Sequence, residues 1–130
     1  MAFDHLGIAT TDADDLAALF EVLCDAPPVH KERFGGMDVR FLELDGGYFE
    51  LLEPHDEGPI RGFLDSHGPG IHHIALRTDD IDAALDRARE AGVDLVDEEP
   101  RQGAWGHEVA FLHPSSTGGV LVEFVAGEGA

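Results

Sequence analysis

Apolar residues recur along this chain with two periods, one typical of strands and one typical of helices. Phe3–Thr10 predicts a strand, and Thr11 or Asp12 then caps a helix whose first turn is acidic. The apolar residues of that helix fall at i, i+3, i+4 and i+7, which predicts one buried stripe: Leu16, Leu19, Phe20 and Leu23. Pro27 and Pro28 end the helix.

Three strand-like stretches follow this helix. They are separated by the turn signals Gly35-Gly36 and Asp45-Gly46-Gly47: Val29–Phe34, Met37–Leu44 and Tyr48–Glu53. Residues 55–69 form a linker, in which a short helix from Pro59 to about Ser66 is predicted.

The same order of elements then returns. Gly70–Thr78 predicts a strand, Asp79 or Asp80 caps a second helix, and Gly92 closes it. The predicted buried stripe of this helix is Ile81, Ala84, Leu85 and Ala88. The last three predicted strands are Asp94–Glu98, His107–His113 and Gly119–Val125.

This repetition predicts an α+β fold in a single domain, residues 1–130. Two βαβββ modules, about 3–54 and 70–126, are expected to form an open, cupped mixed sheet with approximate two-fold symmetry. Polar residues inside the apolar strands recur with the elements. His5 and His73 open matching strands, and Glu50 and Glu123 interrupt the last strand of each module.

Two-fold symmetry would bring these four residues together near the axis. Two buried carboxylates in one cavity repel each other unless a cation neutralises them. Imidazole and carboxylate ligands without sulfur suit Co²⁺, Mn²⁺, Fe²⁺, Ni²⁺, Mg²⁺ or Zn²⁺. Four ligands leave two positions of an octahedral ion open, as a catalytic site requires. We therefore expect a metal site formed by His5, Glu50, His73 and Glu123.

The other histidines have no counterpart in the repeat. His72 should point to the face opposite His73, because alternate strand residues face opposite sides. His107 and His113 are possible pocket residues, and the rest are interpreted mainly as solvent or loop residues: His30, His55 and His67.

The net charge of −19 disfavours nucleic acids and anionic membrane surfaces as partners. No apolar run of 18 residues and no secretory signal are visible, and Cys24 is the only cysteine, so the cytoplasm is the expected location. An ordinary acidic protein is one interpretation. We favour adaptation to a salt-rich cytoplasm, because salt screens the self-repulsion of such a charge.

Salt adaptation predicts a higher melting temperature in molar KCl than in dilute buffer. Thermal unfolding followed at both salt concentrations measures the difference. A melting temperature that does not change with salt would argue against this interpretation.

Four segments together resemble the methylmalonyl-CoA epimerases, a family of the vicinal oxygen chelate superfamily that also contains glyoxalase I and extradiol dioxygenases. The resemblance extends from about residue 3 to 125. The segments are Asp4-His-Leu-Gly-Ile-Ala, Phe49-Glu-Leu-Leu-Glu-Pro, Gly70-Ile-His-His-Ile-Ala-Leu and Phe111-Leu-His-Pro-Ser-Ser-Thr-Gly-Gly-Val-Leu-Val-Glu.

The resemblance implies interconversion of (2R)- and (2S)-methylmalonyl-CoA, with Co²⁺ or a similar divalent ion as cofactor and an acyl-CoA substrate. It matches the metal positions to His5, Glu50, His73 and Glu123, and it implies that Glu123 also acts as an acid/base. A homodimer is expected by the same resemblance.

This sequence departs from the family at two positions. Val39 stands where some members have a catalytic glutamate, which leaves Glu43, on the same predicted strand face, as a candidate second base beside Glu50 or a water. Ser115 stands where members often have a basic residue. Candidates for contacts to the CoA phosphates are then Arg33, Arg40, Arg61 and Arg101, and Trp105 either covers the pocket or packs.

Two alternatives stay open from the sequence. One is another chelate enzyme of the same fold, a glyoxalase I-type lyase or a dioxygenase. A dioxygenase would favour iron held by two histidines and one carboxylate. The other is a non-enzymatic module that binds a small molecule, for which the two glutamates would have no acid/base role.

Overall fold

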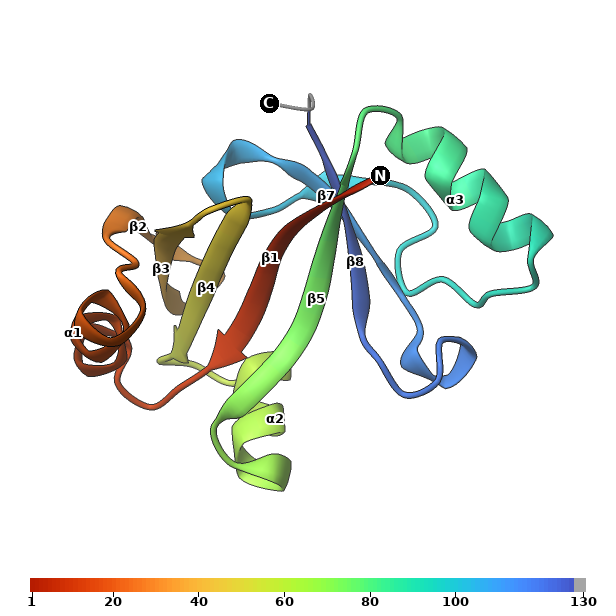
Figure 1. Cartoon of the computed structure of the whole chain (residues 1–130). Helices are drawn as coiled ribbons and strands as arrows, with labels where there is room; N and C mark the ends of the chain where they lie inside the picture. Colours follow the sequence, from red (N-terminus) through yellow and green to blue (C-terminus); the bar gives the residue numbers. More distant parts are fainter. Residues whose placement is uncertain (128–130) are drawn as a thin grey trace. The chain divides into compact units, whose positions relative to one another are not determined.

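The chain folds into eight strands and three α-helices within residues 1–127, which are the residues that the computed structural model describes (Figure 1). The first part of the chain contains β1 (Ala2–Ala9), α1 (Ala13–Cys24), β2 (Pro28–Phe34), β3 (Met37–Leu44), β4 (Gly47–Pro54) and α2 (Pro59–His67). The second part contains β5 (Gly70–Thr78), α3 (Ile81–Glu90), β6 (Arg101–Gln102), β7 (Glu108–Leu112) and β8 (Val122–Ala126).

Two compact units divide these elements between them. The first half is the unit His5–His72, and the second half is Met1–Asp4 together with the chain from His73 onward. In the first half the strand order is β2-β3-β4-β1, and in the second it is β5-β8-β7-β6. In each half the first strand pairs in parallel with the last, and the remaining pairs are antiparallel. The predicted βαβββ order and mixed strand pairing are therefore confirmed in both halves.

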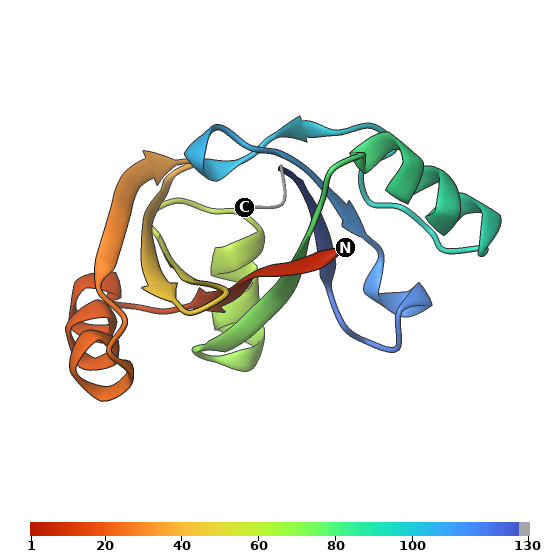
Figure 2. The same cartoon turned by 45° about the horizontal axis from the view of Figure 1, so that its top comes forward.

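The β2–β3 hairpin follows directly from the predicted turn signal. Phe34 pairs with Met37, so Gly35 and Gly36 are the two central residues of the turn. Their φ angles are +57° and +74°, values that glycine adopts without the steric cost of a Cβ. Figure 2 shows the hairpin from a second direction.

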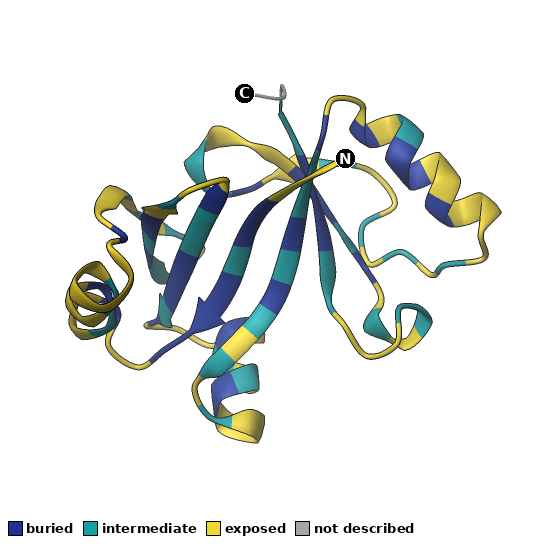
Figure 3. Cartoon of the chain, in the orientation of Figure 1, coloured by how far each residue is buried: buried dark blue, intermediate teal, exposed yellow. Residues whose placement is uncertain are grey.

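One helix covers one face of the strands in each half. In the first half, α1 packs on the strands through a cluster made of Ile8, Ala13, Ala17, Ala26, Leu42 and Leu51. In the second half, the four predicted stripe residues of α3 pack in one cluster with Ala110, Leu112 and Phe124. Figure 3 shows the buried and exposed sides of both helices. We call the helix-covered face of each half the outer face, and the opposite face the inner face.

Asp12 and Asp80 begin the two helices in the same way. Asp12 Oδ1 accepts from the Asp15 amide at 3.0 Å, and Asp80 Oδ1 accepts from the Ala83 amide at 3.0 Å. These contacts satisfy amide groups that lack partners at a helix N-terminus. Both predicted caps are confirmed.

The predicted stripe of α1 is wrong at two positions. Leu19 and Leu23 are 55% and 69% exposed, whereas Ala13 and Ala17 are buried. Leu16 and Phe20 pack at the edge of the core. The buried face is therefore centred on the alanines, whose small side chains let the helix approach the strands. Leu19 and Leu23 lie further round the helix.

The predicted strand Asp94–Glu98 is also wrong. In this segment Leu95 makes only an isolated bridge to Leu112, and Asp97 Oδ2 accepts from the Phe111 amide at 2.9 Å. A side chain thus takes the amide hydrogen that a neighbouring strand would use. The strand that pairs with β7 is instead β6, Arg101–Gln102. Within the described residues, no helix combines the length and hydropathy needed to cross a bilayer.

Candidate metal centre

In the first half, β1 and β4 place a histidine and a glutamate side by side. Their parallel register sets Gly7 opposite Glu50, and His5 projects to the same face as Gly7 because it lies two residues away. His5 Nε2 is 3.2 Å from Glu50 Oε1. Both residues are buried, at 4% and 6% exposure. Gly7, opposite Glu50, contributes no side chain to this face.

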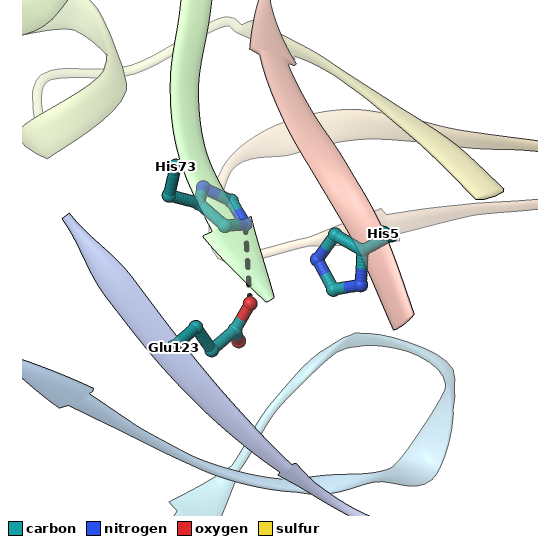
Figure 4. Close-up of side chains that lie close together, drawn as sticks. All are labelled: His5, His73 and Glu123. Carbon is teal, nitrogen blue, oxygen red and sulfur yellow. Dashed lines mark ion pairs between the residues drawn. The ribbon is translucent and has the colours of Figure 1, made fainter. Parts of the chain in front are cut away.

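The second half repeats this arrangement on β5 and β8. Ala75 lies opposite Glu123, and His73 is two residues before Ala75. His73 Nε2 is 3.1 Å from Glu123 Oε1, and the side chains face each other across the two strands (Figure 4). These residues are 5% and 6% exposed. Ala75, like Gly7 in the first half, is a small residue at the register position opposite the glutamate.

Each imidazole packs against a phenylalanine on the strand that runs antiparallel to the glutamate's strand. Phe41 lies opposite Glu50, and Phe111 lies opposite Glu123. The His5 and Phe41 rings are 5.8 Å apart at 84°, and the His73 and Phe111 rings are 5.4 Å apart at 81°. Such edge-to-face contacts orient the imidazoles. Neither phenylalanine was predicted from the sequence, although Phe41 and Phe111 each begin a Phe-Leu pair that recurs in the two halves.

The chemistry of these buried pairs fits a divalent cation. A buried carboxylate is costly unless a positive charge or hydrogen bonds compensate it. Neutral imidazole nitrogen and carboxylate oxygen are ligands that divalent transition metals accept. Each half supplies one imidazole and one carboxylate as possible ligands. The four residues selected from the sequence are thus two similar donor pairs, one in each half.

A second group of possible ligands lies on the outer face of the first half. Ligand atoms of Asp38, Glu53 and His55 all lie within 4.8 Å of one another. His55 Nε2 is 2.8 Å from Asp38 Oδ2 and 3.3 Å from Glu53 Oε2. The second oxygen of each carboxylate has another partner. Asp38 Oδ1 is 3.1 Å from Arg33 Nε, and Glu53 Oε1 accepts from the Ala13 amide at 2.7 Å. Arg33 supplies positive charge here and His55 contacts both carboxylates, so the cluster is accounted for as a polar network that ties β3, β4 and α1 together.

This network makes the stability of the fold depend on pH in the acid range. The hydrogen bond from His55, with a smaller contribution from the Arg33 charge, holds the pKa of Asp38 below its ordinary value of 3.8. A lowered folded-state pKa stabilises the fold above the ordinary value, and that contribution is lost as pH falls through the folded-state pKa. Asp38→Asn should lower the melting temperature at pH 7, and its difference from the parent should shrink below about pH 4. A difference that stays constant from pH 7 to pH 3 would contradict this.

The other candidate residues from the sequence have surroundings of their own, and Glu43 lies in the same cross-strand row as His5, with Tyr48 between them. Glu43 is exposed, and its amide donates to Pro27 O at 2.9 Å. Val39 is fully buried. Three of the four arginines considered for phosphate contacts pair with carboxylates: Arg33 with Asp38, Arg40 with Asp14, and Arg101 with Asp97. Arg61 Nη2 donates to the carbonyl of Pro54 at 3.1 Å.

The remaining histidines have different surroundings. His72 meets the ring of Phe63 edge-on, at 5.1 Å and 87°. His113 is exposed and its Nδ1 accepts from the Ser115 amide, and exposed His107 has its ring 6.1 Å from that of Trp105. Trp105 is partly buried in a 3₁₀ turn with φ +60°, which is uncommon for a residue with a side chain. His30 was interpreted mainly as a solvent or loop residue; it lies in β2, within the strand predicted as Val29–Phe34, and is partly buried.

Comparison with known proteins gives the class to which this fold and these residues belong. A model of the glyoxalase/bleomycin resistance protein/dioxygenase superfamily matches residues 4–111. The chain belongs to this superfamily, whose members include the vicinal oxygen chelate enzymes.

Within the superfamily, the chain belongs to the methylmalonyl-CoA epimerase family. It is 41% identical to the ethylmalonyl-CoA/methylmalonyl-CoA epimerase of Cereibacter sphaeroides, over 92% of this chain and 93% of that protein. A Streptomyces coelicolor methylmalonyl-CoA epimerase variant in complex with 2-nitronate-propionyl-CoA superposes with a TM-score of 0.90 at 35% identity, covering 97% and 94% of the two chains. A methylmalonyl-CoA epimerase in complex with methylmalonyl-CoA and NH4⁺ superposes with a TM-score of 0.90 at 35% identity, covering 96% and 93%.

Proposed function

We propose that this chain catalyses the metal-dependent epimerisation of (2R)- and (2S)-methylmalonyl-CoA. The observation that carries the proposal is the repeated buried pair, His5 with Glu50 and His73 with Glu123. Membership of the epimerase family supports the choice of substrate. The two pairs together would hold one divalent ion, with Co²⁺ as the first candidate and Mn²⁺, Ni²⁺, Mg²⁺ or Zn²⁺ as alternatives.

The substrate explains why such a site is useful. Its α-hydrogen lies between a thioester carbonyl and a carboxylate, and its removal leaves a planar enolate. When bound, a divalent ion supplies positive charge for the two substrate oxygens on which negative charge develops. Glu123 accepts the α-proton from one face and can return it there. Inversion requires a second proton donor on the other face, for which Glu43 is the candidate taken from the sequence.

A direct assay tests this proposal. Purified protein loaded with Co²⁺ should convert either single epimer of methylmalonyl-CoA into the same mixture of both, followed by circular dichroism of the substrate. Protein treated with a chelator should not, and added metal should restore conversion. An optically stable substrate in the presence of metal-loaded protein would contradict the proposal.

Arg61 is the proposed contact to the CoA phosphates. No described ion pair within residues 1–127 includes it, whereas Arg33, Arg40 and Arg101 are already paired with carboxylates. An acidic chain needs such a cation to accept a phosphate. Arg61 also donates to the carbonyl of Pro54, the last residue of β4, which is the strand that carries Glu50.

Arg61→Gln should therefore raise KM for the CoA ester about tenfold and leave kcat nearly unchanged, as loss of one contact worth about 1.4 kcal/mol would do. Steady-state kinetics measure both constants. Arg87→Gln, an exposed arginine on α3, is the matched control and should behave like the parent. Equal effects of the two substitutions would argue for a general charge effect and against a specific contact.

We also propose that the protein is a cytoplasmic homodimer. The family resemblance supports the dimer, and so does an apolar strip on α1 that the fold leaves exposed. Leu19, Val22 and Leu23 are 55%, 84% and 69% exposed at i, i+3 and i+4. Burying such a strip against a second copy would be favourable. Light scattering gives the mass in solution, and a monomer at micromolar concentration would contradict the dimer.

A further inference from the structure

An arginine lies on the inner face of the second half, one row of residues away from Glu123. Arg101 pairs with Val109 across β6 and β7, and Val109 pairs with Val125 across β7 and β8. Val125 lies two residues after Glu123 on one strand, so both project to the same face, and the cross-strand row extends that face to Arg101. All of these residues belong to the second half, as His73 does.

Phe111 connects the guanidinium of Arg101 with the proposed catalytic pair. The Phe111 ring centroid is 5.5 Å from Arg101 Cζ and 5.4 Å from the centroid of the His73 imidazole. A guanidinium within about 6 Å of an aromatic centroid is attracted by the negative face of the ring. Phe111 also lies opposite Glu123 in the β7–β8 register. A permanent positive charge therefore lies one aromatic ring away from the carboxylate that we propose as the acid/base.

Asp97 fixes the direction of this guanidinium. Its Oδ1 is 3.0 Å from Arg101 Nε, and its Oδ2 accepts from the Phe111 amide at 2.9 Å. One oxygen thus ties the carboxylate to β7, and the other holds the arginine. The hydrogen bond of Arg101 to Asp97 uses Nε, and no described hydrogen bond in residues 1–127 uses its two Nη atoms. Because the side chain is 50% exposed, these two groups can receive an anion.

A second arginine on the inner face of this half is less accessible. Arg77 pairs with Val125 at the far end of the same row, and its Nη1 is 3.5 Å from Oδ1 of Asp4. Asp4 is buried, and the Arg77 side chain is only 21% exposed. Of the two arginines, Arg101 is therefore the one that an incoming anion reaches more easily.

We propose that Arg101 binds the free carboxylate of the acyl-CoA substrate through its two Nη atoms, and that Asp97 positions the guanidinium. This inference rests on the proposed epimerase function. The carboxylate of methylmalonyl-CoA is bonded to the α-carbon, so it lies close to Glu123 when Glu123 accepts the α-proton. The CoA phosphates lie at the far end of the pantetheine arm. The link from Arg101 through Phe111 to the catalytic pair therefore favours the carboxylate as the bound anion.

This contact makes the site selective for carboxyacyl thioesters. The guanidinium fork matches the two oxygens of a carboxylate, and the hydrogen bonds are strengthened by the opposite charges. A thioester without the carboxylate, such as propionyl-CoA, leaves the two Nη atoms without this partner, and a site built for a polar group rejects an analogue that lacks it. Holding the carboxylate also orients the α-carbon toward Glu123.

The test compares three ligands, methylmalonyl-CoA, propionyl-CoA and CoA. Titration calorimetry gives Kd for each, with an equilibrated mixture of the methylmalonyl-CoA epimers and Co²⁺-loaded protein. In Arg101→Gln the preference for methylmalonyl-CoA over propionyl-CoA should fall about tenfold or more, while the Kd of CoA stays within about twofold of the parent value. Arg101→Lys should keep part of the preference, because lysine retains the charge without the fork. Arg61→Gln should instead weaken all three ligands alike.

Two further variants separate positioning and general charge from direct binding. Asp97→Asn keeps an oxygen for the Phe111 amide but removes the charge that holds Arg101, so it should lose a smaller part of the preference. Arg89→Gln is the matched control, because Arg89 is an arginine of the same half whose Nη1 lies 2.9 Å from Oδ1 of Asp86. Its Kd values should equal those of the parent. Melting temperature and metal content show whether each variant is folded and loaded, and Arg101→Lys carries the test if Arg101→Gln is unfolded.

An unchanged preference in the Arg101 variants would overturn the inference. Equal weakening of all three ligands in Arg101→Gln would overturn it as well, because that result marks a contact to the CoA phosphates. If the parent protein does not invert methylmalonyl-CoA, the proposed function fails together with this inference. That result is distinct from an active parent whose preference for the carboxylate does not depend on Arg101.

Discussion

Glu123→Gln is expected to abolish epimerisation, with a fall in kcat of at least about 10³-fold. Glu123 is buried at 6% exposure and lies 3.1 Å from His73 Nε2, so it is the proposed acid/base on its face of the substrate and a proposed metal ligand. The amide has the same shape and keeps an oxygen that can bind a cation, but it cannot accept a proton from carbon. Rates of α-proton exchange and of inversion, measured for both epimers, check this.

Metal content decides how that loss is interpreted. Elemental analysis of Glu123→Gln should find metal bound, with the substrate still inert. If the variant has lost the ion, activity must be compared at saturating Co²⁺. Retained exchange and inversion in metal-loaded Glu123→Gln would contradict the acid/base role of this residue.

Replacing His73 is expected to remove the dependence of stability on metal. A ligand present at 100 times its Kd stabilises the folded state by about 2.7 kcal/mol, which corresponds to roughly 10 °C in melting temperature for a chain of this size. The parent protein should gain about that much on addition of Co²⁺. His73→Ala should gain little and lose activity, because one of the proposed ligands and one of the two His–Glu pairs are gone.

The neighbouring histidine provides a matched control for this prediction. His72 lies on the same strand but contacts Phe63 instead of Glu123. His72→Ala should therefore keep the full rise in melting temperature with Co²⁺. Equal rises in His72→Ala and His73→Ala would contradict the proposed ligand set.

The repeated elements explain why much of the fold was predictable. Asp12 and Asp80 each cap a helix, and Ile81, Ala84, Leu85 and Ala88 form the buried face of α3, because capping and helical periodicity are local properties of the sequence. Leu19 and Leu23 were placed wrongly because α1 packs through its alanines, a choice made by the strands beneath it. Asp97 was read as a strand residue, although its side chain binds the Phe111 amide.

The candidate ligands were selected from the repeat, whereas their neighbours were not. His5, Glu50, His73 and Glu123 are polar residues in apolar strands, and each has a counterpart at the matching position of the other half. Arg101 was selected by its charge alone, without its neighbours Asp97 and Phe111. Their arrangement depends on the β6–β7 register and on the contact of Asp97 with the Phe111 amide. Only the three-dimensional structure makes that arrangement visible.

The most direct test of the central claim is deuterium incorporation coupled to inversion. Co²⁺-loaded protein is incubated with one epimer of methylmalonyl-CoA in D₂O, and NMR with a chiral analysis follows the α-position. The proposed function predicts that the other epimer forms with deuterium at that carbon, and that a chelator stops the reaction. Absence of both exchange and inversion with metal bound, particularly if a glutathione hemithioacetal is converted instead, would contradict it.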